Sequence, residues 1–198
     1  MALADIAICI EKGAKTRGDF DTYIAGLMAR SDLLLSGKGV HKGDLVTALA
    51  DLTTAILVVS ADPVLAATLS KRPVFGGLSE LELGGANVPS GGTLMSHLYD
   101  QRAMVFLARK QFSPALQDAN RAISLSPKNP NAYNVRGIVF SGMLRKQNAL
   151  SDYSEAIRLG PTMGPWYINR SEIYKAFGQL DAANRDMQMC CRETPGKR

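Results

Sequence analysis

Residues 130–163, PNAYNVRGIVFSGMLRKQNALSDYSEAIRLGPTM, decide the fold of this protein. In the first half, aromatic and small residues recur at positions i, i+4 and i+7, which is one face of a helix: Tyr133, Gly137 and Phe140. In the second half, after a polar turn, a similar face recurs: Ala149, Tyr153, Ala156 and Ile157. Pro161 then ends the second helix because proline cannot continue the hydrogen-bond ladder. The stretch therefore predicts a hairpin of two helices.

The same pattern recurs in register on both sides of this stretch, at intervals of 34 residues. Eight columns of similar residues hold over three units without a gap: Tyr99, Tyr133 and Tyr167; Arg102, Arg136 and Arg170; Ala103, Gly137 and Ser171; Phe106, Phe140 and Tyr174; Ala115, Ala149 and Ala183; Asp118, Asp152 and Asp186; Ala122, Ala156 and Cys190; Pro127, Pro161 and Pro195. An ungapped internal repeat of this length indicates an array of helical hairpins.

This pattern resembles the tetratricopeptide repeat (TPR), whose helices carry small residues at their closest contact, aromatic residues beside them and a proline at the end. The resemblance covers residues 96–197 in three units. It implies an all-α solenoid, in which hairpins stack into a superhelix with a concave groove lined by the first helix of each unit.

We expect six segments along the chain. Residues 1–19 form an N-terminal helix or cap, 20–63 a degenerate hairpin of the same kind, and 64–95 a glycine-rich loop. Three regular repeats follow at 96–129, 130–163 and 164–198, the last with a short basic tail. The degenerate unit is identified by Ala48, Asp51, Ala55 and Ile56, which match residues of the later units. The loop is either an interface or merely flexible.

Composition restricts the class of protein. The chain has 198 residues, of which 46% are hydrophobic and 21% charged, so it has enough apolar residues for a core. The longest apolar run is interrupted by Asp62 and Pro63, which predicts no membrane span. Three cysteines form no disulfide framework, and the N-terminus carries acidic residues instead of a basic signal. We expect an intracellular, reducing compartment: the cytoplasm, including a cytoskeletal or ciliary assembly, or an organelle matrix.

The resemblance also implies which residues face the groove. A partner would meet aliphatic and amide groups there: His97, Gln101, Met104, Leu107, Asn131, Asn134, Val135, Ile138, Ile168, Asn169 and Glu172. Some members of the family clamp a C-terminal carboxylate with lysine, asparagine and arginine side chains. The matching positions here are Asp100, Met104, Val135, Pro165 and Asn169, which do not form such a clamp. The alternative is that several of these aliphatic residues are buried between units.

The arginine and aspartate columns predict ion pairs inside each unit. In a helical hairpin, facing positions have a nearly constant sum of indices, and the sum for these two columns is only slightly larger than that for the contact of small residues. The expected structural pairs are Arg30–Asp51, Arg102–Asp118, Arg136–Asp152 and Arg170–Asp186.

The last helix predicts an apolar end to the array. Met187, Met189, Cys190 and Cys191 lie on it with little chain left to cover them. A partner or a second copy would cover this terminal surface, so homodimerisation through the C-terminal helix is one expectation. The other is that the first helix of the same unit covers part of it.

The sequence predicts no catalytic, metal or cofactor site. Two histidines, His41 and His97, cannot complete a nucleophile–base set, and no cysteine–histidine cluster has the spacing of metal ligands. Basic residues form no stripe interleaved with aromatics, which argues against nucleic acid. We therefore expect a non-catalytic protein-interaction scaffold, a subunit of a larger multiprotein complex. The alternative is an adaptor or co-chaperone that captures a short apolar segment in its groove.

Overall fold

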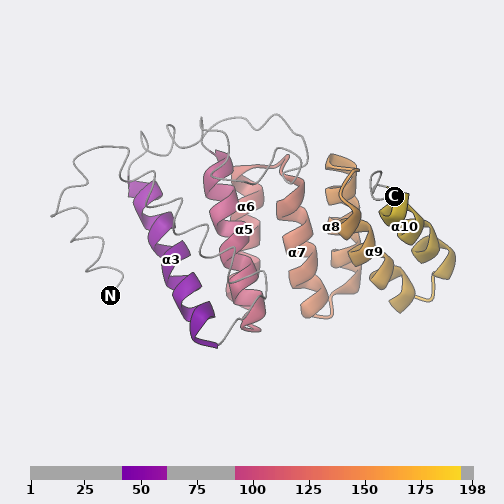
Figure 1. Ribbon diagram of the computed structural model, residues 1–198, viewed down its shortest axis with the longest axis horizontal. Helices are drawn as coiled ribbons and strands as arrows, with labels where there is room; N and C mark the ends of the chain where they lie inside the picture. The colour runs from indigo at the N-terminus through magenta and orange to yellow at the C-terminus, as the bar shows by residue number, and fades with distance from the viewer. Residues whose placement is uncertain (1–41, 62–91, 193–198) are drawn as a thin grey trace, which may run out of the picture.

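The computed structural model describes residues 42–61 and 92–192, and these two ranges contain helices and no strand (Figure 1). The helices follow in the order α3 (Lys42–Ala61), α5 (Gly92–Ala108), α6 (Phe112–Leu125), α7 (Pro130–Gly142), α8 (Lys146–Leu159), α9 (Gly164–Ala176) and α10 (Leu180–Arg192). The all-α class expected from the repeat is confirmed for this part of the chain. The expected N-terminal helix, the first helix of the degenerate unit, residues 64–91 of the loop and the basic tail lie outside it.

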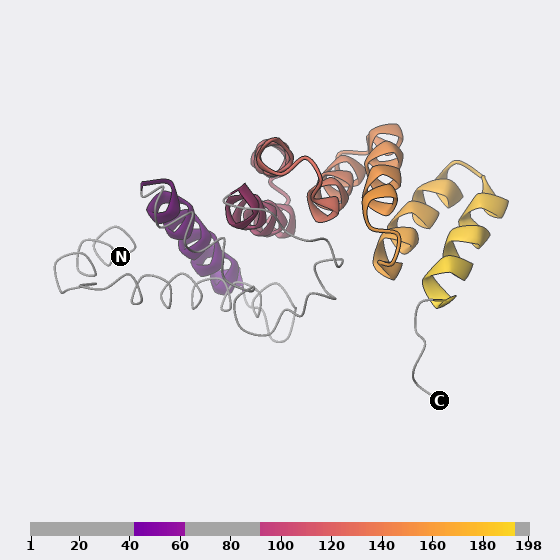
Figure 2. The same ribbon diagram turned by 90° about the horizontal axis from the view of Figure 1, so that it is seen from above.

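Consecutive helices pair as the repeat requires. α5 packs on α6, α7 on α8 and α9 on α10, and each second helix packs on the first helix of the next unit. The first helices α5, α7 and α9 also contact one another in sequence, which makes them one layer of the array. Seen from above, the hairpins stand side by side in chain order as a curved row (Figure 2).

Two helices begin earlier than the sequence suggested. α5 begins at Gly92, inside the segment expected to be loop, because the extra turn places Leu94 against α3. α3 begins at Lys42, inside the expected glycine-rich turn. Leu45 in its first turn packs against the core.

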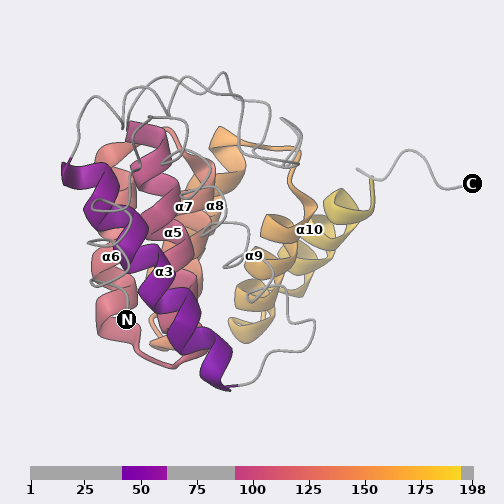
Figure 3. The same ribbon diagram turned by 60° about the vertical axis from the view of Figure 1, so that its left-hand side comes forward.

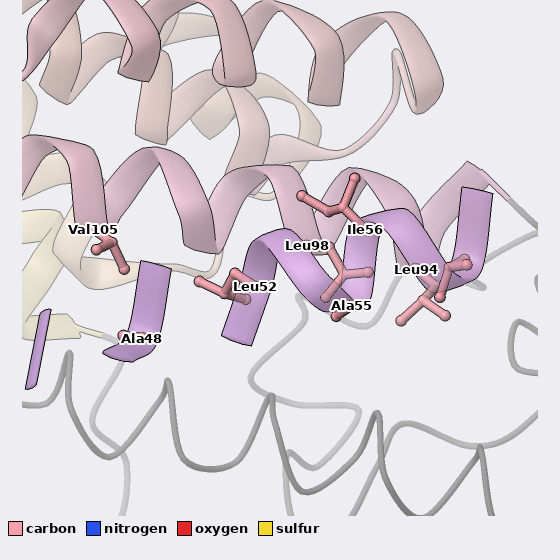
Figure 4. Close-up of a cluster of buried hydrophobic side chains, with 8 residues drawn as sticks. Ala48, Leu52, Ala55, Ile56, Leu94, Leu98 and Val105 are labelled. Atoms are coloured by element: carbon pink, nitrogen blue, oxygen red, sulfur yellow. The ribbon is translucent and has the colours of Figure 1, made fainter. Parts of the chain in front are cut away.

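The α3–α5 junction is held by an aliphatic core. Its buried members come from both helices: Ala48, Leu52, Ala55, Ile56, Val59, Leu94, Leu98 and Val105 (Figure 4). α3 lies directly in front of α5 in Figure 3. It therefore stands against α5 as α6 stands against α7 and α8 against α9, as a second helix of a preceding unit would.

Inside the hairpins, residues 16 positions apart face one another, and in two of the three units one is small and the other large. Gly137 faces Tyr153, and a Cβ atom added at Gly137 would meet Tyr153 Cε1 at 2.6 Å. In the last unit, the Ser171 hydroxyl contacts Met187 Sδ at 3.4 Å. In the first regular unit the equivalent residues, Ala103 and Ala119, are both fully buried. The second and third units thus pair a small residue with a large one, whereas the first pairs two alanines.

Candidate functional site

Each regular hairpin is closed by a bidentate ion pair between its arginine and its aspartate. Nε of Arg102 lies 2.7 Å from Asp118 Oδ2, and its Nη2 lies 2.8 Å from Oδ1. The pairs Arg136–Asp152 and Arg170–Asp186 repeat this geometry. These are three of the four pairs expected from the sequence. In the fourth, Asp51 is buried but Arg30 lies outside the described residues.

Aromatic residues enclose each guanidinium. The Arg136 Cζ atom lies 5.7 Å from the Tyr133 ring centroid and 5.8 Å from that of Phe140, and the other two units are alike. The hydrogen bond to Asp152 raises the pKa of Arg136, and Asp118 and Asp186 act in the same way on the pKa of Arg102 and Arg170. The pairs hold the two helices of a unit in register.

The same arginines also connect neighbouring units. Nη1 of Arg136 donates to Asn120 Oδ1 at 3.0 Å, and Nη1 of Arg170 donates to Ser154 Oγ at 3.2 Å. Nη1 of Arg102 reaches Thr53 Oγ1 on α3 at 3.4 Å. These acceptors form a column that the repeat pattern had not predicted. The sequence signal for these acceptors is a polar residue two positions after each aspartate. It is present in α3 as well as in the regular units.

The predicted groove residues differ in exposure. Three are buried, which corrects their assignment to an open surface: Gln101, Asn134 and Val135. Val135 belongs to a core cluster with Ala103 and Ala119, because the first helices contact one another. Met104 packs against that cluster and Ile138 against the next one. His97, Leu107, Asn131 and Asn169 are partly exposed, whereas Ile168 and Glu172 are exposed.

A buried polar cluster lies between α5 and the start of α7. The Asn129 side chain caps α7, where its Oδ1 accepts from the Asn131 amide at 3.0 Å. Its Nδ2 donates to Ser96 Oγ and to Asp100 Oδ2, each at 3.1 Å. Ser96 in turn donates to the Ala122 carbonyl at 3.0 Å. Asn129 and Ser96 did not appear among the predicted site residues, although an asparagine before Pro130 is a helix-cap signal.

The buried Asp100 Oδ1 of this cluster has no hydrogen-bond partner within the described residues, and neither has the buried Nε2 of His97 on the same helix. Burial raises the pKa of Asp100 to about 8, against the opposing hydrogen bonds from Asn129 and Asn131. Burial also lowers the pKa of His97 to about 4. Both side chains are therefore mainly uncharged near neutral pH.

Further along the same face, Asn169 Nδ2 of α9 donates to Asn134 Oδ1 of α7 at 3.0 Å. Beyond it, Ile168 is 39% exposed, and Lys175 donates to Glu172 at 2.6 Å on the surface. The groove face thus has a buried amide–carboxyl centre and an accessible aliphatic and charged end on α9.

The terminal surface is smaller than the sequence suggested. Met189 and Cys190 pack against a core cluster that contains Ile157 and Trp166, so they contribute mainly to intramolecular packing. Met187 is 36% exposed and contacts Ser171. The Cys191 side chain lies outside the described residues. The first helix of the unit covers part of this surface, and dimerisation through it stays a prediction.

Within the described ranges, no group of three or more histidine, cysteine, aspartate or glutamate side chains could hold a metal ion. No described helix is both long and apolar enough to cross a bilayer.

Comparisons with known proteins agree with the repeat at the level of structure. No family model and no curated protein sequence matches the chain. Among solved structures, the TPR domain of Arabidopsis OM64 superimposes with a TM-score of 0.54 at 19% identity, covering 79% of this chain and 98% of that domain. A crystal structure of MamA gives a TM-score of 0.48 at 20% identity, covering 77% and 90%. The second TPR of Spaghetti (RPAP3), bound to an HSP90 peptide, gives 0.49 at 17% identity, covering 50% and 93%.

The likeness to the OM64 domain and the repeated geometry together establish the fold. The chain is a TPR-like protein, an all-α solenoid of helical hairpins.

Proposed function

We propose that this chain is a non-catalytic protein-interaction scaffold whose groove face, formed by α5, α7 and α9, binds a segment of a partner protein. The proposal rests on where the recurring residues of the repeat make their contacts. The arginines, aspartates and aromatic residues are used inside and between hairpins, which leaves the first-helix face as the variable surface. A rigid solenoid with a variable inner face is suited to hold an extended or helical segment.

The chemistry of the face indicates what it would hold. Aliphatic contact is available at Ile168 and Leu107, and hydrogen-bonding groups at Asn131, Asn169 and Glu172. A short segment with an apolar anchor and an exposed backbone fits this combination. We place the chain as a subunit of a larger assembly, where a partner would hold such a contact permanently.

A second candidate is a transient adaptor without a carboxylate clamp. Spaghetti (RPAP3) was solved with an HSP90 peptide that ends in a carboxylate, SRMEEVD. In this chain, the position that the resemblance assigns to a clamp residue holds Asp100, which is buried and has an oxygen without a hydrogen-bond partner in the described part. A buried and mainly uncharged carboxyl at that place supplies no positive charge to hold a second carboxylate. An adaptor role would therefore rest on a short apolar segment and not on a terminal carboxylate.

Site-directed photo-crosslinking in an extract of the native source tests the proposal. A photoreactive phenylalanine analogue at Ile168 samples the groove face, and the same analogue at the exposed Ser151 of α8 is the matched control on the outer layer. We expect a discrete protein adduct from position 168 that is absent from position 151. Identical adducts from both positions, or none from either, would contradict binding of a partner at the groove face. Survival of the complex through gel filtration favours the assembly subunit over the transient adaptor.

A further inference from the structure

The hairpin turns of the three regular units lie along one edge of the solenoid. Helices α5, α7 and α9 all run towards this edge and α6, α8 and α10 run away from it, so the three turns form a row at the lower side of Figure 1. The turns between units lie at the opposite edge. We call the row of hairpin turns, residues 109–111, 143–145 and 177–179 with the first helical residue after each, the turn edge.

Large apolar side chains are exposed along the turn edge. Leu144 is 80% exposed, Leu180 61% and Phe177 42%, and they come from two neighbouring turns. Of the exposed large hydrophobic residues in the described ranges, Leu144 and Leu180 are the two most exposed. Each protrudes from a turn, and Phe177 and Leu180 flank the same turn. They therefore form apolar tips and not a continuous groove.

Leu144 is held in an unfavourable backbone conformation. Its φ is +61°, in the left-handed region that disfavours residues with a β-carbon. The equivalent residues of the other two units share it: Lys110 has φ +58°, and Gly178 has φ +73°, for which this conformation is easy. The hairpin turn therefore imposes this conformation in all three units, and the leucine at this tip buries little apolar surface in return for it. A leucine that is 80% exposed, at a position that lysine and glycine also occupy, points to a role outside the fold.

Basic residues accompany the apolar tips. Four exposed cations stand in the first two turns: Arg109, Lys110, Arg145 and Lys146. None of the four forms an ion pair with another described residue, whereas Lys175 near the third turn is paired with Glu172. The exposed Asp181 is the single acidic residue among residues 109–112, 143–146 and 177–181. The edge is thus positive as well as apolar.

We infer that the turn edge is a docking surface for an anionic phospholipid membrane. A bilayer interface accepts separate apolar side chains from protruding turns, and lysine and arginine beside them reach the lipid phosphates. A protein partner would instead need a continuous patch of matched shape, which a row of tips does not offer. Bound in this way, the solenoid would stand on the membrane by one edge and leave its groove face open to a protein segment.

Vesicle sedimentation of the full-length protein tests this inference. The probe is a vesicle of phosphatidylcholine with about 30% phosphatidylserine, compared with pure phosphatidylcholine, at about 0.1 M salt. We expect sedimentation with the anionic vesicles only, and release as the salt concentration rises. Absence of sedimentation with anionic vesicles, or equal sedimentation with both kinds, overturns the inference and favours an acidic protein as the partner of the edge.

Two variants with equal changes in charge locate the contact. Leu144→Asp with Leu180→Asp removes two tips, and we expect the partition coefficient to fall about ten-fold or more. The matched control, Leu57→Asp with Ser60→Asp, introduces the same two charges at exposed positions of α3 away from the turns, and it should bind as the wild type does. Equal loss in both variants would overturn the assignment to the edge. Circular dichroism verifies that each variant is folded.

A third variant separates this role from a structural one. Leu144→Gly relieves the backbone strain, so we expect it to raise the melting temperature while it weakens sedimentation several-fold. A change that stabilises the fold and reduces vesicle binding cannot come from unfolding. Unchanged sedimentation of this variant would contradict insertion of the Leu144 tip. The result is independent of the crosslinking test of the groove, which reports on a different face.

Discussion

The middle hairpin and the N-terminal junction are stabilised by different kinds of interaction. In the α7–α8 hairpin, a guanidinium lies between two aromatic rings and forms a bidentate ion pair with a buried carboxylate. At the α3–α5 junction, aliphatic side chains fill the contact, and Arg102 donates a hydrogen bond to Thr53. Directional ion pairs fix the register of the two helices, whereas aliphatic packing depends on how well the side chains fill the space between them. The two regions should therefore respond differently to substitution.

The largest loss of stability is expected from a substitution in the α7–α8 hairpin. Asp152→Ala leaves the Arg136 guanidinium partly buried without its carboxylate, which should cost about 3 kcal/mol of the free energy of unfolding. The single tryptophan, Trp166, packs in the cluster of Ala156 and Ile157 on α8, so its fluorescence should report this loss directly in urea unfolding. Glu155→Ala breaks the exposed pair with Arg158 and should leave the midpoint unchanged. Equal shifts for both variants would mean that burial does not distinguish the pairs.

A slightly smaller and more local effect is expected at the junction. Leu52→Ala removes a fully buried side chain from the α3–α5 core, at a cost of about 2–3 kcal/mol. Because repeat arrays unfold through nearest-neighbour contacts, α3 should separate first. The helical signal should then fall at a lower urea concentration while the Trp166 transition stays in place. Coincident transitions would show that the junction and the hairpins form one cooperative unit. Leu57→Ala, at an exposed position of α3, is the control.

The volume of the hairpin interior can be tested at Gly137. A methyl group there would meet the Tyr153 ring at 2.6 Å, so Gly137→Ala should destabilise the protein by about 1–2 kcal/mol despite the better helix propensity of alanine. The double variant Gly137→Ala with Tyr153→Leu should recover part of this loss in thermal unfolding. Ala103 and Ser171 show that the position accepts a β-carbon when the facing residue is not tyrosine. No recovery in the double variant would contradict the pairing.

The smallest expected change in the free energy of unfolding is a dependence on pH. The pKa of Asp100 is raised to about 8 in the folded protein, so the folded state keeps a proton that the unfolded state loses at lower pH. The resulting stability is present at acidic pH and is lost as pH rises towards 8. The lowered pKa of His97, about 4, has the opposite sign but acts only below its unfolded value near 6.5. Between pH 6.5 and 8, the free energy of unfolding should therefore fall by on the order of 1 kcal/mol.

Asp100→Asn keeps an acceptor for Asn129 and removes the titration. Its urea midpoint should be constant between pH 6.5 and 8, whereas the wild-type midpoint decreases. A wild-type midpoint that rises over this range would show that Asp100 is ionised in the folded protein.

The sequence by itself determined the repeating unit of this fold, a hairpin of two helices. The 34-residue columns predicted the helices, their pairing and the Arg102–Asp118, Arg136–Asp152 and Arg170–Asp186 pairs, because these contacts lie within one unit and recur with it. It also matched α3 to the second helices of the later units.

Only the tertiary structure decided which residues of the first-helix face are accessible. Val135, Gln101 and Asn134 are buried there, and Asp100 lies in a network with Asn129. It also decided that Met189 and Cys190 pack inward and that Leu144 protrudes with a strained backbone. The physical reason is that burial between units depends on how closely successive hairpins approach. That distance is set by the volumes of side chains far apart in the sequence, which a periodic pattern does not contain.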